Sequence, residues 1–284
     1  MKHLNRITMM VLSTWTLIAH AACPADSDAA LMAARYANLQ AVPNPPADMD
    51  MADALCGREK YTGFLRQNAG KVVSYKVALT TPAMQKRFNH PKPIRGTMFG
   101  TMLEDGAEIP ARFGARPLYE ADLVVSVKDA GSNQAKTPHE ALRHIAQIYP
   151  FIELPDLMVE EPAKITGAGL AYINMGARLG VLGKPVAVKA TPELVKALAE
   201  MTVHFVDHEG KVFETSKGSA ILEQPLNAVL WLVEDLNKSG IQLKKGDLLS
   251  LGSFSQPRLP QPGTGAKVIY EGLPGNPTVS VNFK

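Results

Sequence analysis

The sequence predicts an α+β protein, in which a helical N-terminal part precedes a mixed, curved β-sheet core of the barrel or roll type. Two observations support this prediction. Apolar residues recur at helical spacing in two segments before residue 70, whereas short β-prone runs dominate from residue 71 onward. Helices are few in that second part and do not alternate regularly with the strands, which argues against a doubly wound sheet.

The first 21 residues have the pattern of an export signal. Lys2 and Arg6 are basic, residues 7–19 form a short apolar stretch, and small residues flank His20 where signal peptidase would cut. The stretch is shorter than the about 20 residues that a membrane-spanning helix needs. We therefore predict a signal peptide at 1–21 and a periplasmic or secreted protein, with no membrane segment after signal removal.

Composition and charge exclude some partners and chemistries. Hydrophobic residues make up 46% of the chain, which is ordinary for a globular protein with a core. The formal net charge is +3, and two of these charges, Lys2 and Arg6, leave with the signal. Without a basic run or a stripe of Arg and aromatic residues, nucleic acid is not expected as a partner. The motifs G-x-S-x-G, H-E-x-x-H, C-x-x-C and a Walker loop are absent from the sequence.

Cys23 and Cys56 are the only cysteines, and three interpretations remain open for them. In an oxidising compartment they could form a disulfide that ties the N-terminal tail to the first helical region. They could also be two unrelated thiols. Alternatively, Cys23 could be the lipidated first residue of a lipoprotein, although His20 stands where a lipobox usually has Leu. Two cysteines are too few for a disulfide scaffold, so the fold must depend on its apolar core.

The helical N-terminal region, residues 22–70, contains two predicted helices. Residues 28–39 have apolar side chains at helical spacing after several candidate caps. The sequence VPNPP at 42–46 ends this helix, and residues 51–67 form the second one. We expect the region to be a cap or lid on the sheet that follows.

From residue 71 the pattern is that of strands. Residues 72–79 (VVSYKVAL) alternate between the two faces of a strand, and residues 119–127 (YEADLVVSV) are strongly β-prone. A helix is predicted from Thr137 or Pro138 to Pro150, and residues 82–95 and 162–172 are predicted to be irregular. The other elements expected are a helix at 225–237 and strands at 151–154, 179–182, 186–189, 202–206, 248–251, 266–270 and 278–283.

Two acidic residues, Glu120 and Asp122, lie two positions apart in the predicted strand 119–127. Side chains at this spacing point to the same face of a strand, so the two carboxylates lie side by side among apolar residues. Such a pair repels itself and is costly to bury unless it is neutralised. Carboxylate oxygens are the ligands that magnesium, manganese and calcium prefer. An ordinary solvated acidic patch is the alternative.

Glu153 and Lys76 are further charges inside apolar strand-like runs. Glu153 lies in FIEL, where a buried charge needs a basic partner or a metal. Lys76 lies in the middle of VVSYKVAL and is either an ordinary solvent-facing lysine or a group that holds a substrate carboxylate or donates a proton. Charges on three separate apolar strands favour a site over coincidence.

The order of these motifs resembles that of the 2-keto-4-pentenoate hydratases and their decarboxylase relatives, in the fumarylacetoacetate hydrolase superfamily. YKVALT at 75–80 is similar to the lysine strand "YKIGLT" of that family, EADL at 120–123 to its "EAEI", and FIE at 151–153 to its "ALE". NMGARLGVLG at 174–183 resembles "NASSGLFVLG". The late motifs that also match are GSA at 218–220 with Pro225, Ala228 and Trp231, and KGD at 245–247 with GS at 252–253.

The resemblance implies a catalytic domain of the fumarylacetoacetate hydrolase type at residues 71–284. It implies Mg²⁺ or Mn²⁺ held by Glu120, Asp122 and Glu153, a small 2-oxo acid as substrate, and assembly into a homo-oligomer. Lys76 would anchor the substrate carboxylate or transfer a proton, and Ser253 would be a hydrogen-bonding partner. The reaction expected is hydration of a 2-hydroxy-2,4-dienoate. The alternatives are a 2-oxo acid decarboxylase, an acylpyruvate-type C–C hydrolase, or an exported binding protein without catalysis.

The sequence departs from that family at three places. Asp122 stands where the family usually has Glu, which shortens the side chain by one methylene. Ile94 stands where the family usually has an acidic residue, in a stretch like "PDFG", and Arg178 replaces a small polar residue. The family serves aromatic compound catabolism in the cytoplasm, whereas this chain begins with the pattern of an export signal.

Overall fold

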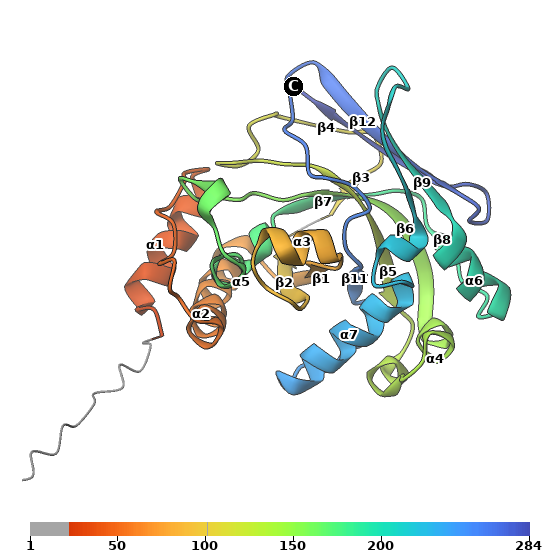
Figure 1. Ribbon diagram of the computed structural model, residues 1–284, viewed down its shortest axis with the longest axis horizontal. Coiled ribbons are helices and arrows are strands. Elements are labelled where there is room, and N and C mark those ends of the chain that lie inside the picture. The colour runs from red at the N-terminus through yellow and green to blue at the C-terminus, as the bar shows by residue number, and fades with distance from the viewer. Residues whose placement is uncertain (1–22, 101) are drawn as a thin grey trace, which may run out of the picture.

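The computed structural model describes residues 23–100 and 102–284, and the predicted signal peptide at 1–21 lies outside these residues (Figure 1). A mixed eight-stranded sheet forms the centre, with strand order β2-β1-β11-β5-β6-β7-β3 and β8 paired to β6. Its strands are β1 (Val72–Ala78), β2 (Ile94–Phe99), β3 (Leu103–Glu104), β5 (Glu120–Val127), β6 (Ile145–Leu154), β7 (Leu179–Leu182), β8 (Val186–Ala187) and β11 (Leu248–Ser250). The predicted α+β class with a curved mixed sheet is confirmed.

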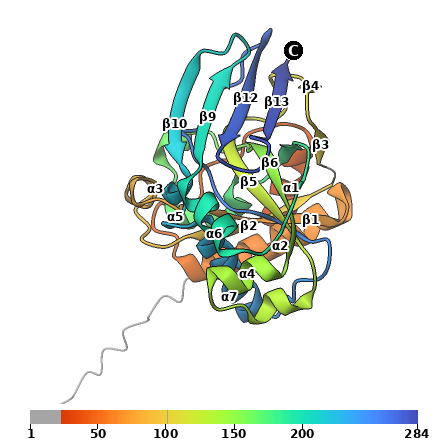
Figure 2. The ribbon, with the colours of Figure 1, turned by 90° about the vertical axis from the view of Figure 1, so that its right-hand side faces the viewer.

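A second sheet of five strands packs against the first, in the order β10-β9-β12-β13-β4. Figure 2 shows β10, β9, β12 and β13 side by side, with α6 at their lower end and α4 and α7 below it. The strands are β4 (Ala107–Ile109), β9 (Thr202–Asp207), β10 (Val212–Lys217), β12 (Thr264–Glu271) and β13 (Thr278–Phe283), and the helices are α4 (Pro138–Arg143), α6 (Pro192–Glu200) and α7 (Pro225–Lys238). The main core cluster joins the inner faces of both sheets to α7.

The N-terminal helices pack against a second apolar cluster. They are α1 (Asp26–Ala37) and α2 (Met51–Ala69), at the red end of the chain in Figure 1. Asp50 caps α2, since its carboxylate accepts the backbone N–H of Asp53 at 2.8 Å. Met32, Tyr61 and Leu65 of these helices share their cluster with residues of α5 (Gly167–Tyr172). The two predicted helices are therefore present, against one side of the sheet.

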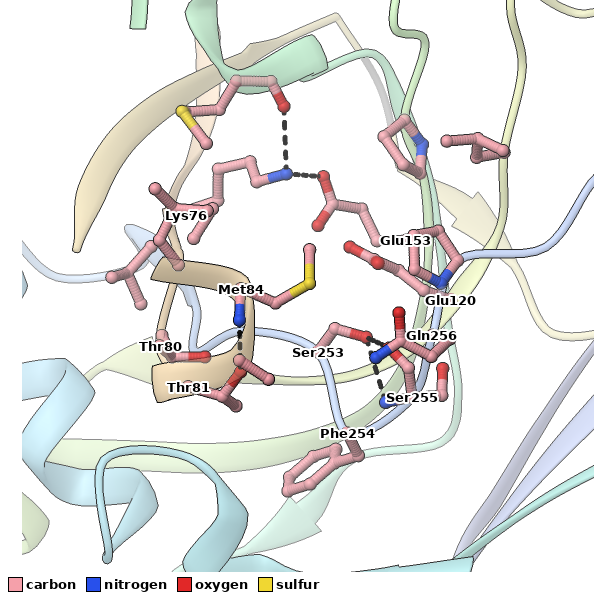
Figure 3. Close-up of a pocket in the computed structure, with 18 of the residues that line it drawn as sticks. Lys76, Thr80, Thr81, Met84, Glu120, Glu153, Ser253, Phe254, Ser255 and Gln256 are labelled. Atoms are coloured by element: carbon pink, nitrogen blue, oxygen red, sulfur yellow. Dashed lines mark hydrogen bonds and ion pairs between the residues drawn. The ribbon is translucent and has the colours of Figure 1, made fainter. Parts of the chain in front are cut away.

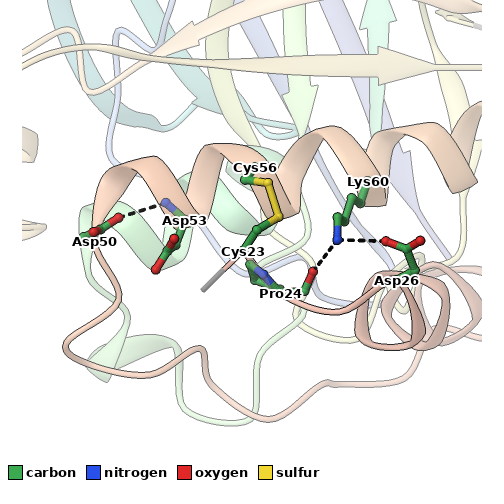
Figure 4. Close-up of a disulfide and its surroundings, with 7 residues drawn as sticks. All are labelled: Cys23, Pro24, Asp26, Asp50, Asp53, Cys56 and Lys60. Atoms are coloured by element: carbon green, nitrogen blue, oxygen red, sulfur yellow. Dashed lines mark hydrogen bonds and ion pairs between the residues drawn. A yellow bond between two sulfur atoms is a disulfide. The ribbon is translucent and has the colours of Figure 1, made fainter. Parts of the chain in front are cut away.

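Cys23 and Cys56 form a disulfide that joins the start of the described chain to α2 (Figure 4). The side chain of Lys60, one turn further along α2, supports the same contact by donating to the Pro24 carbonyl at 2.8 Å and pairing with Asp26 at 2.8 Å. Of the interpretations left open by the sequence, pairing is confirmed. Because the Cys23 sulfur is in the disulfide, the alternative of a lipid anchor on it is wrong.

We expect reduction of this disulfide to destabilise the protein. Closing a loop over a separation of 33 residues removes conformational freedom from the unfolded chain, worth about 3.5 kcal/mol in the chain-entropy model. Differential scanning calorimetry should show Tm falling by about 10 °C with dithiothreitol or in the double variant Cys23→Ser/Cys56→Ser. Reductant should not affect the double variant further. An unchanged Tm in the variant would contradict this prediction.

Three segments differ from the predictions. Residues 82–95 contain a short helix, α3 (Pro82–Arg87), and the start of β2, and residues 162–172 contain α5, capped by Thr166. The helix predicted to end at Pro150 ends at Arg143, and β6 begins at Ile145. Apolar residues in that segment fit both periods, and pairing of Ile148 with Val125 on β5 decides for a strand.

In residues 23–100 and 102–284, none of the helices combines the length and the apolar character that crossing a membrane requires.

Candidate active site

The predicted acidic residues meet on β5 and β6. These strands are antiparallel neighbours, and Glu120 lies directly opposite Glu153, while Asp122 lies opposite Phe151. The side chains of Asp122 and Glu153 are 0% and 1% exposed, and Glu120 is half-buried beside a cavity. Residues directly opposite each other across an antiparallel pair have Cβ atoms about 5 Å apart. The strand register therefore gathers three carboxylates in one buried region.

Lys76 reaches the same region from β1. Its ammonium forms an ion pair with Glu153 and lies 3.4 Å from the carbonyl oxygen of Met175. The lysine is 2% exposed. Burial opposes its charged form, but Glu153 and Glu120 favour that form more strongly, so that the pKa of Lys76 is raised above its ordinary value. Lys76 is therefore a buried cation held at the carboxylates, and the interpretation as a solvent-facing lysine is wrong.

The acidic residues resist ionisation while no cation balances them. Burial, followed by repulsion from Glu153, raises the pKa of Glu120 to about 8. The same two causes raise the pKa of Asp122 to about 7, although the hydroxyl of Ser250 opposes the shift. A buried carboxylate that is ionised lacks the hydration that would stabilise its charge in water. Neutralisation by a proton or a cation is therefore favourable.

Asp122 is held away from the cavity by its own hydrogen bonds. Its carboxylate accepts the hydroxyl of Ser250 at 2.7 Å and the backbone N–H of Gly252 at 3.1 Å. Its backbone carbonyl accepts the hydroxyl of Tyr270, which also accepts the backbone N–H of Phe151 at 3.2 Å. Tyr270 comes from β12 and thus links the second sheet to both carboxylate-bearing strands.

Ser253 lies beside the carboxylates at the edge of the cavity (Figure 3). Its hydroxyl oxygen lies 3.1 Å from the carbonyl of Ala121 and 2.8 Å from that of Ser255. Ser255 in turn accepts the backbone N–H of Ala121 at 3.0 Å through its own hydroxyl. The loop that follows β11 is therefore fastened to β5, and this places Ser253 next to Glu120.

A cavity of about 290 Å³ connects these groups. Lys76, Glu120, Glu153 and Ser253 line it, and Figure 3 shows Met84 of α3 pointing into the same space. Four of the five residues singled out from the sequence therefore share one cavity, and Asp122 lies behind them. Residues 93–96, which include Ile94 at the family's acidic position, do not contribute to the described lining.

The charges at this cavity fit a divalent cation. Three carboxylates share one ammonium, which leaves two negative charges unbalanced when all are ionised. Oxygen donors of this kind are the preferred ligands of Mg²⁺ and Mn²⁺. In the described part of the chain, no three acidic, His or Cys side chains are arranged as a ready-made metal cage. The carboxylate oxygens are suitable ligands for such an ion. Of the three carboxylates, that of Asp122 accepts hydrogen bonds from Ser250 and Gly252.

Asn174 supports the site, but the search for charged residues within apolar strands did not identify it. It is fully buried, and its side-chain amide accepts the backbone N–H of Thr97 at 2.8 Å and donates to the carbonyl of the same residue at 2.7 Å. Asn174, Met175 and Gly176 are all in the left-handed region, with φ of 56°, 57° and 63°. This turn directs the Met175 carbonyl toward Lys76. A lone Asn inside the apolar run AYINM is the signal that could have indicated it.

Glycine is required at position 96 because Asn174 and Lys76 leave no room for a side chain there. A Cβ there would lie 2.9 Å from the carbonyl oxygen of Asn174 and 2.9 Å from the Cγ of Lys76. The missing side chain allows the lysine to pass between β2 and the left-handed turn.

Arg178 lies outside the cavity and has a structural role. Its Nε donates to the carbonyl of Phe113 at 2.6 Å, and its Nη1 donates to the carbonyl of Tyr36 at 3.1 Å. The guanidinium stacks over the Tyr36 ring at 4.2 Å and lies 3.5 Å from buried Asp156. The substituted position therefore connects α1 to the core.

The comparisons with known proteins agree with the sequence motifs. No protein-family model matches the chain. It is 27% identical over 241 residues to a 2-keto-4-pentenoate hydratase of Burkholderia vietnamiensis, covering 81% of this chain and 88% of that protein. It is also 25% identical over 224 residues to a 2-hydroxyhexa-2,4-dienoate hydratase of Comamonas testosteroni, covering 77% and 81%. These relatives are hydro-lyases by name, as predicted for this chain.

Solved structures share the fold. A 4-oxalocrotonate decarboxylase from Pseudomonas putida G7, complexed with magnesium and adipate, superposes with a TM-score of 0.79 at 20% identity and covers 92% of this chain and 99% of that one. A fumarylpyruvate hydrolase from Pseudomonas aeruginosa, in complex with Mn²⁺ and pyruvate, has a TM-score of 0.54 at 13% identity, covering 74% and 89%.

The prediction of a periplasmic or secreted location is contradicted by these comparisons, in which the chain aligns with hydratases and with a decarboxylase. The resemblance read from the motifs is confirmed along about four fifths of the chain. In sequence the chain is similar to 2-keto-4-pentenoate hydratases, and in fold it is similar to a 4-oxalocrotonate decarboxylase and a fumarylpyruvate hydrolase.

Proposed function

We propose that this protein is a metal-dependent hydratase that adds water to a 2-hydroxy-2,4-dienoate, by way of its 2-oxo-enoate form, to give a 4-hydroxy-2-oxo acid. The observation that carries this proposal is that the buried residues Lys76 and Glu153 share one cavity with half-buried Glu120, with Asp122 behind them. The similarity to named hydratases favours this reaction among those of the fold.

Glu120, Asp122 and Glu153 are the residues that we propose to hold Mg²⁺ or Mn²⁺. A bound ion of this kind would act as a Lewis acid that neutralises negative charge on the 2-oxo oxygen. Asp122 would reach the ion after giving up part of its bonding to Ser250 and Gly252. Mg²⁺ and Mn²⁺ are the ions named for two solved structures of this fold, which supports but does not decide between them.

Lys76 is the residue that we propose to anchor or protonate the substrate. Its ammonium is the one cation among the described lining residues, so it is the natural partner for a substrate carboxylate. In the reaction, the 2-hydroxyl proton is lost and C5 gains a proton, which gives the conjugated 2-oxo-3-enoate. Water then adds its hydroxyl to C4 and a proton to C3. The ammonium of Lys76 and the hydroxyl of Ser253 are the proton-bearing groups placed to assist.

A C–C hydrolase is less well supported. Cleaving an acylpyruvate requires a base that activates water, and histidine is the usual one. None of the described residues that line the cavity is a histidine. Assembly into a homo-oligomer remains a prediction.

The proposal is tested by following the ultraviolet absorbance of freshly generated 2-hydroxypenta-2,4-dienoate. Metal-stripped protein should be inactive and should regain turnover with Mg²⁺ or Mn²⁺. Glu120→Gln should lower kcat/KM at least about 100-fold, since loss of one charge-stabilising group costs that much in other enzymes. Glu271→Gln, on an exposed carboxylate, is the matched control. Metal binding without turnover in the unaltered protein would favour a binding protein over a hydratase.

Metal affinity should rise steeply between pH 6 and pH 8. Glu120 and Asp122 have pKa values of about 8 and about 7, so below pH 7 both hold protons that a cation must displace. Well above pH 8 both are ionised and the affinity should level off. Calorimetric titration with Mn²⁺ at pH 6, 7 and 8, in buffers of different ionisation enthalpy, would detect proton release. An affinity independent of pH over this range would contradict the assignment of these ligands.

A further inference from the structure

A second groove, of about 350 Å³, lies where α2, β2 and α7 meet. It is separate from the active-site cavity, since the two share none of their described lining residues. The charged lining residues are four cations and two carboxylates: Arg58, Lys92, Arg95, Lys238, Glu234 and Asp235. The lining therefore carries an excess of two positive charges.

Two arginines are buried together at this groove. Arg58 of α2 and Arg95 of β2 are 5% and 2% exposed, and Nη1 of Arg58 donates to the backbone carbonyl of Arg95 at 2.9 Å. Burial, followed by repulsion from Arg95, lowers the pKa of Arg58. Like charges buried side by side are unfavourable unless negative charge neutralises them.

The negative charge that the protein supplies here is only partial. Asp235 accepts Nε of Arg95 at 2.6 Å, and the other lining carboxylate is paired with Lys238. Arg58 pairs with Glu59, whose side chain is 61% exposed, so water screens this interaction. An anion in the groove would complete the neutralisation of both arginines.

Arg95 also keeps a hydrogen-bond donor for such an anion. Its Nε donates to Asp235 and its Nη2 donates to the hydroxyl of Ser239 at 3.1 Å, while Nη1 has no acceptor among the described residues. Every fully buried polar side-chain atom in the described part of the chain has a partner. Nη1 is therefore not sealed inside the protein, and the groove that Arg95 lines makes it accessible.

The rest of the groove has an apolar wall. Met51 and Leu55 of α2 and Trp231 of α7 line it and are half-buried. Met51 and Leu55 pack on the cluster that holds the N-terminal helices, and Trp231 packs on the main core cluster, so the wall is supported on both sides. An indole beside a groove offers a flat surface on which a ring can pack.

We propose that this groove binds an organic phosphate monoester that carries an aromatic ring, with its phosphate at Arg58, Lys92 and Arg95 and its ring beside Trp231. The double negative charge of such a phosphate matches the excess of the lining, and guanidinium groups bind phosphate oxygens in pairs. The site lies outside the cavity of the proposed hydratase reaction, so this inference does not depend on that function.

The fluorescence of Trp231 gives a readout that is local to the groove. The other tryptophan of the chain is Trp15, outside the described residues, so in Trp15→Phe the signal comes from Trp231 alone. Phenyl phosphate, titrated into this variant with Mg²⁺ present, should change the fluorescence saturably. Inorganic phosphate lacks the ring and benzoate carries a single charge, so each should bind on the order of tenfold more weakly.

Variants of the cationic residues give a second measurement. Arg95→Met should weaken phenyl phosphate on the order of tenfold or more, and Asp235, left without its partner, is 34% exposed and remains hydrated. Lys92→Gln changes an exposed residue that the core does not need and should weaken binding about threefold. Lys267→Gln, on an exposed lysine of β12, is the matched control and should bind as the unaltered protein does.

Four results would overturn parts or all of this inference. Unchanged affinity in both Arg95→Met and Lys92→Gln would exclude the site. Loss of the fluorescence change in Lys76→Met would place the ligand in the active-site cavity instead. Benzoate binding as tightly as phenyl phosphate would replace the phosphate by a carboxylate, and equal affinity for inorganic phosphate would exclude the ring at Trp231.

Discussion

Replacing Lys76 with methionine is expected to lower kcat/KM for the dienoate by about three orders of magnitude. The lysine is 2% exposed and pairs with Glu153, so water cannot substitute for the lost ammonium. Methionine is similar in length and apolar, and it therefore removes the charge with little change in shape. Steady-state kinetics at saturating Mg²⁺, with calorimetry of pyruvate binding, would measure the loss.

Two further variants make this result specific. Lys196→Met changes an exposed lysine and should behave as the unaltered protein. Lys76→Arg keeps the charge but brings a planar head group into a space that Gly96 and Asn174 confine, so it should recover only part of the activity. If Lys76→Met kept more than about a tenth of the activity, the ammonium would not be the group that anchors or protonates the substrate.

Replacing Arg178 with alanine is expected to lower the free energy of unfolding by about 3 kcal/mol, because it leaves the buried carboxylate of Asp156 with two backbone N–H donors but without a cation. The guanidinium donates to the carbonyls of Phe113 and Tyr36, and Asp156 beside it is 1% exposed. The Tyr36 ring also loses its stacking contact. Urea unfolding followed by circular dichroism would measure the change.

A double-mutant cycle isolates the charge in this effect. Asp156→Asn removes the carboxylate that Arg178→Ala would leave unpaired, so the double variant should be more stable than the sum of the single losses predicts. The free energy of unfolding of Arg178→Lys should lie between those of the unaltered protein and Arg178→Ala, since lysine keeps the charge but not the stacked, forked geometry. A loss below about 1 kcal/mol in Arg178→Ala would show that the N-terminal helices do not depend on this residue.

The strands that carry the site were predictable because each has a local pattern. VVSYKVAL and YEADLVVSV are β-prone by composition, and a charged residue within such a run stands out whatever its partners are. The same reasoning applies to α7, whose helical spacing of apolar residues is unambiguous. Residues 145–150 were misassigned because their apolar positions fit both a helix and a strand, and only pairing with β5 distinguishes the two.

The chain by itself determined the charged residues of the site and the kind of strand on which each one lies, since alternation and composition are local properties. Only the tertiary structure decided that Lys76 pairs with Glu153, a residue 77 positions away, although β11 and β5 lie between their strands in the sheet. It also decided that Asp122 faces Ser250 and Gly252, and that Met84 lines the cavity. These contacts join segments far apart in the sequence, so no local pattern encodes them.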